Sequence, residues 1–210
     1  MRIITGTARG AKLATIEGDA TRPTTDRVKE AIFSMIQFDI EGRRVLDLFG
    51  GSGQLALEAL SRGAERATII DESRDAVNII IENAKHAKLY EKCRISCCSY
   101  ASFLKGFNES DKFNIVFLDP PYNTSLLHDS LNALSVGNVL ADGALIICES
   151  DTPQSKKKSL EKKNPELKNA SILHDVFSDD EKLMSRYNIE KSSAYGRTRI
   201  TVLSLADTDK

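Results

Sequence analysis

The chain has 210 residues, of which 41% are hydrophobic and 28% are charged, and its formal net charge is −1. This composition is typical of a globular protein with one large domain, and it excludes a chain that is basic throughout. The four cysteines lack the spacing of a zinc site or a disulfide framework, so we expect no metal. Neither a signal peptide nor an apolar run of ~20 residues is found, and we expect a cytoplasmic protein without a membrane segment.

The first forty residues predict a small appendage to a larger domain. Two short stretches within the first sixteen residues, separated by glycines, indicate a β-hairpin. A helix is predicted over residues 22–36, because apolar residues recur there at helical spacing and Thr24 or Thr25 can cap its start. We therefore divide the chain into this hairpin-and-helix appendage, residues 1–40, and a main domain, residues 41–210.

In the main domain, short apolar runs alternate with stretches of helical periodicity. The predicted strands are residues 43–49, 66–71, 93–98, 113–119 and 143–150. The predicted helices are residues 54–63, 73–89, 100–107 and 125–135. Such alternation is typical of an α/β fold, in which helices cover both faces of a parallel sheet.

The C-terminal part of the chain has a different pattern. Residues 153–168 are rich in lysine and lack periodicity, so we interpret them as a surface excursion. Residues 180–205 predict two strands that are joined by a turn at Tyr195 and Gly196. This hairpin would close the sheet, with one of its strands antiparallel to all the others.

Three glycines, Gly50, Gly51 and Gly53, lie between the first strand and the helix that follows it. Glycine lets the backbone approach a ligand closely, and a helix start offers free N–H groups to a negatively charged group. Asp71 ends the second strand, where a carboxylate can accept hydrogen bonds from both hydroxyls of a ribose. The pattern predicts a nucleoside-containing ligand, and the letters GSGQLA also satisfy the fingerprint of dinucleotide-binding folds.

Asp47 favours one class of ligand. It lies inside the first strand, where aspartate is disfavoured, three residues before the first glycine. A carboxylate would repel the negative charge of a pyrophosphate, but it would attract a ligand with a positively charged amino acid end. S-adenosylmethionine carries an ammonium, a sulfonium and a ribose, and we therefore predict it as the cofactor.

The letters DPPY follow the fourth strand and predict the acceptor site. Asp119 would reach the same edge of the sheet, and two prolines fix the backbone after it. The Asp119 carboxylate and the Pro120 carbonyl can accept both hydrogens of an exocyclic amine, while Tyr122 offers a stacking face worth ~1–3 kcal/mol. We predict methyl transfer to an amine nitrogen with these three residues as the catalytic ones, mainly through positioning and electrostatics.

At this point the sequence resembles a known family, the RsmD-type 16S rRNA guanine-N2 methyltransferases. The resemblance is carried by MRIITGTARGAKL, RPTTDRVKEAIFSMI, VLDLFGGSGQLALEALSRGA, VFLDPPY and YGRTRITVL, which together span nearly the whole chain. It implies a Rossmann-like class I methyltransferase fold, with a seven-stranded, mostly parallel sheet whose last strand is antiparallel. It also implies S-adenosylmethionine as the donor and N2 of one guanine in 16S rRNA as the acceptor.

Carried over by position, the resemblance assigns roles to individual residues. Cofactor binding falls to Asp47, Phe49, Gly51, Gly53, Asp71, Glu72, Ser99, Tyr100 and Asp119. Substrate binding falls to Arg9, Arg22, Thr24, Asp26, Arg27 and Tyr122. The chain departs from the family in having Gly50 for a frequent alanine, Asp71 for glutamate, and no acidic or amide residue after the third strand. Glu72 can substitute for the ribose acid, and Ser99 or the backbone at Tyr100 would have to contact the adenine.

The expected partner is 16S rRNA, within the small ribosomal subunit or its late assembly intermediate, and the protein is expected to be a monomer. A nearly neutral protein needs a local basic surface to bind phosphates. We expect this surface near the N-terminus, at Arg2, Arg9, Lys12, Arg22, Arg27 and Lys29. The rival surface is the lysine run from Lys156 to Lys163.

Other functions stay open on the sequence alone. The acceptor geometry also suits methylation of N6 of adenine or N4 of cytosine in DNA, or of a glutamine amide in a protein. The glycine loop also suits a nicotinamide-dependent oxidoreductase. A ribosome assembly factor could keep the cofactor fold without catalysis.

Overall fold

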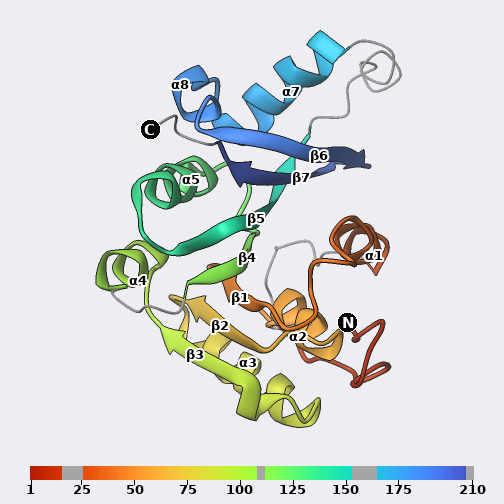
Figure 1. Ribbon diagram of the computed structural model, residues 1–210. Helices are drawn as coiled ribbons and strands as arrows, with labels where there is room; N and C mark the ends of the chain where they lie inside the picture. Colours follow the sequence, from red (N-terminus) through yellow and green to blue (C-terminus); the bar gives the residue numbers. More distant parts are fainter. Residues whose placement is uncertain (16–25, 108–111, 153–164, 207–210) are drawn as a thin grey trace.

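The computed structural model of the protein describes residues 1–15, 26–107, 112–152 and 165–206. Its centre is a seven-stranded sheet with the order β3-β2-β1-β4-β5-β7-β6 (Figure 1). The strands are β1 Arg44–Asp47, β2 Arg66–Asp71, β3 Cys93–Cys97, β4 Phe113–Leu118, β5 Leu140–Asp151, β6 Tyr187–Tyr195 and β7 Thr198–Leu205. The first five are parallel, and β7 is antiparallel to both β5 and β6, as the sequence predicts.

Helices cover both faces of this sheet. They are α1 Asp26–Met35, α2 Gln54–Ser61, α3 Arg74–His86, α4 Tyr100–Gly106, α5 Leu126–Val136, α7 Pro165–Phe177 and α8 Glu181–Met184, with a short 3-10 helix, η1 Tyr90–Lys92. Helices α1, α2 and α3 pack on one face, and α4, α5, α7 and α8 pack on the other. Figure 1 shows α1 and α2 on the right of the sheet and α4 and α5 on its left. Among the described residues, every helix is too short or too polar to cross a bilayer.

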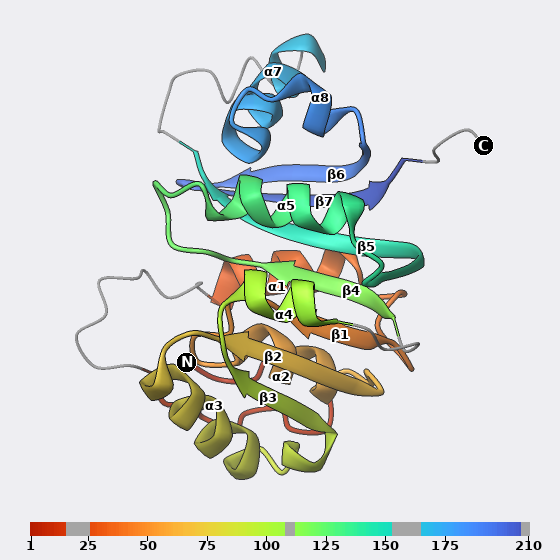
Figure 2. The ribbon, with the colours of Figure 1, turned by 90° about the vertical axis from the view of Figure 1, so that its left-hand side faces the viewer.

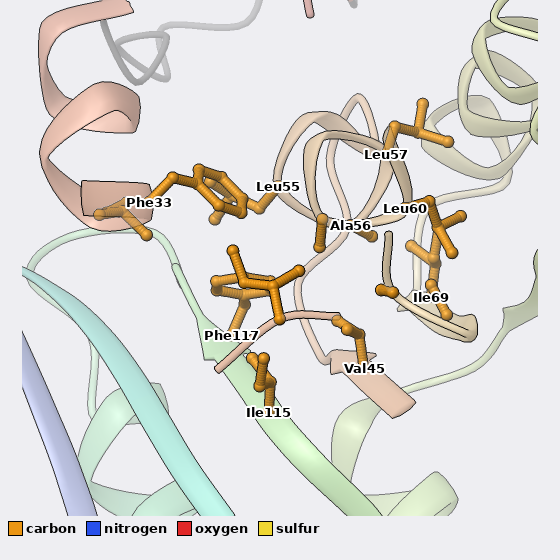
Figure 3. Packing of buried hydrophobic residues seen from close by; sticks show 14 of the residues in the cluster. Phe33, Val45, Leu55, Ala56, Leu57, Leu60, Ile69, Ile115 and Phe117 are labelled. Atoms are coloured by element: carbon orange, nitrogen blue, oxygen red, sulfur yellow. The ribbon is translucent and has the colours of Figure 1, made fainter. Parts of the chain in front are cut away.

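The strands are apolar on both faces because both faces are covered. In β4, Phe117 packs into the core on the α1–α3 side, whereas its neighbours Val116 and Leu118 pack on the opposite side. Phe117 meets Phe33 of α1, with 5.8 Å between the ring centroids (Figure 3). The alternation fixes the register of β4 and therefore the point at which Asp119 emerges.

Two parts of the C-terminal prediction are wrong. Residues 165–168 belong to α7 and not to a surface excursion, because this helix buries Ile172, Val176 and Phe177 against the sheet. The start of the predicted hairpin is instead the short helix α8, which the Asp180 side chain caps by accepting from Leu183 N at 2.8 Å. The predicted caps Thr24 and Thr25, and the lysine run, lie outside the described residues.

The predicted N-terminal hairpin is present, with a bridge between Arg2 and Lys12.

Buried polar side chains of α2 and α3 hold this hairpin against the main domain. Glu58 accepts from the backbone N–H groups of Ile4 and Thr5 at 2.7 and 3.0 Å. Asn83 bonds to both backbone groups of Ala14 and also donates to the Ser52 carbonyl at 2.8 Å. The hairpin is therefore fastened to the helices that flank the glycine loop. Ile3 and Leu13 extend the core on this face of the sheet.

Candidate functional site

The acids that the sequence singles out meet at the carboxyl edge of the sheet. Asp47 ends β1 and Asp71 ends β2, while Asp119 directly follows β4. The parallel register places Asp47 beside Ile69 of β2 and Phe117 of β4, so the three acids lie on adjacent strands. In Figure 2 this edge is on the left, where the N-terminus also lies.

The glycine loop is shaped to leave space. Gly51 and Gly53 have φ angles of +54° and +78°, a region that disfavours other residues. No described atom lies within 4 Å of the position that a Cβ on Gly51 would take, so the backbone there is open to a ligand. Gly50 differs, because a Cβ there would come within 2.6 Å of Ile69 Cγ2 and 2.9 Å of Ile80 Cδ1.

Asp71 holds this loop in place. Its carboxylate accepts from Gly51 N at 2.8 Å through one oxygen and from Ser73 N at 2.8 Å through the other. A carboxylate oxygen has a second lone pair, so these bonds leave acceptor capacity for the hydroxyls of a ribose. The sequence predicts the ribose role of Asp71 but not this structural one.

Asp47 is almost fully buried, with 1% of its surface exposed. Burial raises the pKa of its carboxyl to about 7, and the negative charge of Asp71 adds to this. The backbone N–H groups of Phe49 and Ala56 act in the opposite direction, toward a lower pKa. A buried carboxyl with so weak a hydrogen-bond set favours a positively charged partner.

Ser99 and Tyr100, which are predicted to contact the adenine, follow β3, and Phe49, which is predicted to bind the cofactor, directly precedes the glycine loop. The rings of Phe49 and Tyr100 are in contact, with 5.6 Å between centroids and a tilt of 41°. The Ser99 hydroxyl caps α4 by accepting from Ser102 N at 3.2 Å, so its side chain already has a structural role. Glu72 is exposed and lies next to Asp71.

Tyr122 is held by a residue that the sequence analysis missed. Its hydroxyl donates to Glu149 Oε1 at 2.7 Å and lies 3.4 Å from Thr198 Oγ1. Burial, and then the nearby Glu149 charge, raises the pKa of Tyr122. Glu149 is itself 4% exposed and lies near the carboxyl end of β5. Glu149 could have been found from the sequence, because it is an acid at the end of an apolar run, as Asp47 is.

The other two residues of the predicted catalytic set are less exposed than a surface loop would be: Asp119 is half-buried and Pro120 is buried.

The predicted RNA-facing residues separate into different groups. Arg9 and Arg27 are exposed, and Asp26 forms an ion pair with Arg2 at 3.2 Å. Arg22 and Thr24 lie outside the described residues.

The expectation that Lys29 binds phosphate is wrong, because its side chain is fully buried beneath the hairpin. It lies 3.6 Å from Glu58 Oε2 and donates to the Arg2 carbonyl. Burial is the main influence on Lys29 and lowers its pKa.

Known proteins resemble this chain over most of its length. The family model described as conserved hypothetical protein 95 matches residues 1–171. Ribosomal RNA small subunit methyltransferase D of Escherichia coli strain K12 is 41% identical over 151 residues, which are 72% of this chain and 75% of that protein. The Haemophilus influenzae protein of the same name is 36% identical over 152 residues, covering 72% of this chain and 79% of that protein.

A solved structure supports the same relationship. The Escherichia coli protein yhhF superposes with a TM-score of 0.73 at 31% identity, covering 98% of this chain and 97% of that chain. The chain therefore shares its sequence pattern with methyltransferase D proteins and its fold with the protein yhhF. The chain belongs to the family of conserved hypothetical protein 95, which is the RsmD family of methyltransferases.

Proposed function

We propose that this protein transfers a methyl group from S-adenosylmethionine to the exocyclic N2 of a specific guanine in 16S rRNA. The observation that carries the proposal is the meeting of Asp47, Asp71 and Asp119 at one sheet edge, beside an open glycine loop, in a member of the RsmD family. The relatives' name, small subunit methyltransferase, supports the choice of substrate. We expect the protein to act in the cytoplasm, as a monomer, on the small subunit or its late assembly intermediate.

The residues present fit S-adenosylmethionine. Asp47 would hold the ammonium of its amino acid end, Asp71 would accept from the ribose, and the rings of Phe49 and Tyr100 would contact the adenine. The buried Gln54 Oε1 at the start of α2 lacks a hydrogen-bond partner among the described residues, which also suits a ligand at this loop. When bound, the cofactor supplies an electrophilic methyl group on a sulfonium.

The acceptor amine would be held by the residues that follow β4. The Asp119 carboxylate and the Pro120 carbonyl would accept its two hydrogens and thereby direct the nitrogen lone pair. Positive charge develops on that nitrogen as its bond to the methyl group forms and the sulfonium–methyl bond breaks, and the two oxygens would stabilise this charge. Asp119 would then accept the proton that the nitrogen releases. Tyr122 would stack on the base, and its bond to Glu149 fixes the ring before the substrate arrives.

The test uses small subunits from a strain that lacks this gene. Purified protein and labelled S-adenosylmethionine are incubated with these subunits, and the modified nucleotide is mapped. We expect one N2-methylguanine in 16S rRNA, and we expect Asp119→Ala to lower kcat by about 10²-fold or more. Thermal unfolding should show that this variant is folded, and calorimetry with S-adenosylhomocysteine will separate any loss of cofactor affinity from the loss in kcat. Methylation of DNA or of a protein glutamine, with unmodified subunits, would overturn the proposal.

A further inference from the structure

A shallow groove of about 530 Å³ lies between α1 and the edge strand β6. Its volume falls within the range of ~300–1,000 Å³ that small-molecule sites occupy. One wall is a single face of α1, and the other is β6. The lining residues are Arg27, Glu30, Ala31, Ser34, Met35, Lys191 and Tyr195. None of the functional assignments above uses the β6 side of this groove.

The groove follows from how α1 sits on the sheet. Apolar residues of α1 share a core with Ile200 and Val202 of β7, so the helix covers β7. The strand β6 lies one position further out, at the edge of the sheet, and α1 leaves part of it open. Figure 1 shows α1 beside the end of β6. The groove is thus built by rigid elements and not by loops.

The chemistry of the lining suits a nucleotide. Arg27 and Lys191 place two positive charges against the single negative charge of Glu30. Lys191 donates to the Met35 carbonyl at the C-terminal end of α1, which fixes the ammonium and leaves two of its three donors. Tyr195 is half-buried and packs its body against the core, so its ring is held as a stacking surface. An aromatic face beside two cations is the combination that binds single-stranded nucleic acid.

Residue contacts link the groove to the candidate acceptor site. Tyr195 ends β6 and is paired with Thr198 at the start of β7. The Thr198 hydroxyl lies 3.4 Å from the hydroxyl of Tyr122. Tyr195 of the groove is therefore linked through Thr198 to Tyr122, on whose ring the target base would stack. Because β6 runs parallel to β1, the Tyr195 end of the groove lies at the same carboxyl edge as the acids.

We propose that this α1–β6 groove binds a nucleotide that neighbours the methylated one in the RNA strand. Its base would stack on Tyr195, and its phosphate would lie between Arg27 and Lys191. Ser34 and Glu30 add hydrogen-bonding groups along the helix wall. The inference rests on the proposed RNA substrate, and it adds a second binding site outside the pocket in which the methyl group is transferred.

Two measurements test the groove. The first is the Kd for a fluorescein-labelled, single-stranded RNA 12-mer of mixed sequence, measured by anisotropy at several salt concentrations. The second is the KM for small subunits from the deletion strain. Tyr195→Leu should weaken RNA binding by about 5- to 150-fold, whereas Tyr195→Phe should keep it, because only the ring is needed. Because Arg27 and Lys191 would share one phosphate, the double variant Arg27→Gln/Lys191→Gln should reduce the slope of log K against log salt by ~0.7, and each single variant should reduce it by less.

Controls separate this inference from the proposed function. Lys105→Gln removes an exposed lysine on α4, on the opposite face of the sheet, and should leave both measurements unchanged. Binding of S-adenosylhomocysteine and thermal unfolding report on folding in every variant. If Tyr195→Leu fails to fold, the Arg27→Gln and Lys191→Gln double variant carries the test.

The possible outcomes are distinct. The groove proposal alone would be overturned if the wild type methylates the subunits but the groove variants have the same KM and salt slope as Lys105→Gln. No binding of the RNA and no methylation of subunits by the wild type would overturn both proposals. A raised KM with unchanged kcat at saturating subunits is the expected result, because the groove binds substrate without touching the reacting atoms.

Discussion

Asp47 is expected to make the binding of S-adenosylmethionine depend on pH. Its carboxyl is almost completely buried, and its pKa of about 7 means that much of the free protein carries a proton there at neutral pH. Only the ionised carboxylate attracts an ammonium. The affinity for S-adenosylhomocysteine, which carries the same amino acid end, should therefore rise with pH and level off above about 7.

The size of this effect follows from the pKa. At pH 5.5, 1.5 units below a pKa of about 7, only about 3% of the carboxyls are ionised. The cofactor must then displace a proton, so its Kd should be about 30-fold higher at pH 5.5 than on the plateau. The ligand's own α-amino group titrates above this window and stays charged throughout it.

Isothermal titration calorimetry measures both the affinity for the ligand and the number of protons that are released on binding. Titrations at pH 5.5, in two buffers that differ in ionisation enthalpy, should reveal the release of nearly one proton per bound ligand. Asp47→Asn should bind weakly at every pH and release none. Asp71→Asn should bind more weakly but keep most of the pH dependence. A wild-type Kd that is constant between pH 5.5 and 7 would refute the reasoning.

The same pKa predicts a trend in stability with the opposite sign. The folded protein keeps a proton on Asp47 up to about pH 7, whereas an unfolded aspartate loses its proton near 3.8. The contribution of this group to the free energy of unfolding is therefore largest below pH 3.8 and falls as pH rises to 7. Asp47→Asn should remove this fall in urea unfolding curves.

Three further predictions concern single side chains. Glu58→Leu should lower the free energy of unfolding by about 3–5 kcal/mol, because it leaves Lys29 buried without its partner; a loss below 1 kcal/mol in urea titrations would contradict this. Gly51→Ala should weaken binding of S-adenosylhomocysteine at least about tenfold in calorimetry, because its methyl group enters the open space of the loop and its φ is unfavourable. An unchanged Kd would refute that role of the loop. Tyr122→Phe should reduce kcat about tenfold with little change in KM, because the ring loses its anchor, while Glu149→Gln keeps an acceptor and should retain more activity. If the wild type, Tyr122→Phe and Glu149→Gln all have the same kcat, a positioning role for Glu149 would be excluded.

The sequence predicts the sheet well because its strands are buried on both faces. Apolar runs that alternate with helical periodicity define all five parallel strands, and the acids at their ends then meet because parallel strands share an edge. Asp47, Asp71 and Asp119 are found in this way. The turn of the closing hairpin is predicted correctly at Tyr195 and Gly196, but the predicted start of its first strand is the helix α8.

The missed features depend on contacts between distant segments. Lys29 looks like a surface lysine, and only the approach of Glu58 and the hairpin allows it to be buried. Glu149 becomes part of the site only because Tyr122 folds back toward β5. Helix α7 is held by Asp175, which pairs with the buried Arg199 at 2.8 Å. Glu149 itself leaves a local signal, as an acid at the end of an apolar run, but the pairings of Lys29 and Arg199 leave none.

The packing around Gly50 constrains how this loop can evolve. The space that the methyl group of an alanine would need is already filled by the side chains of Ile69 and Ile80. Ile80 meets it with the far end of a flexible chain, but Ile69 meets it with a branch on a stiff Cβ. An alanine at this position would therefore require a smaller residue or another rotamer at position 69. The two positions should change together across the family, and a substitution made at one of them alone should disturb the loop.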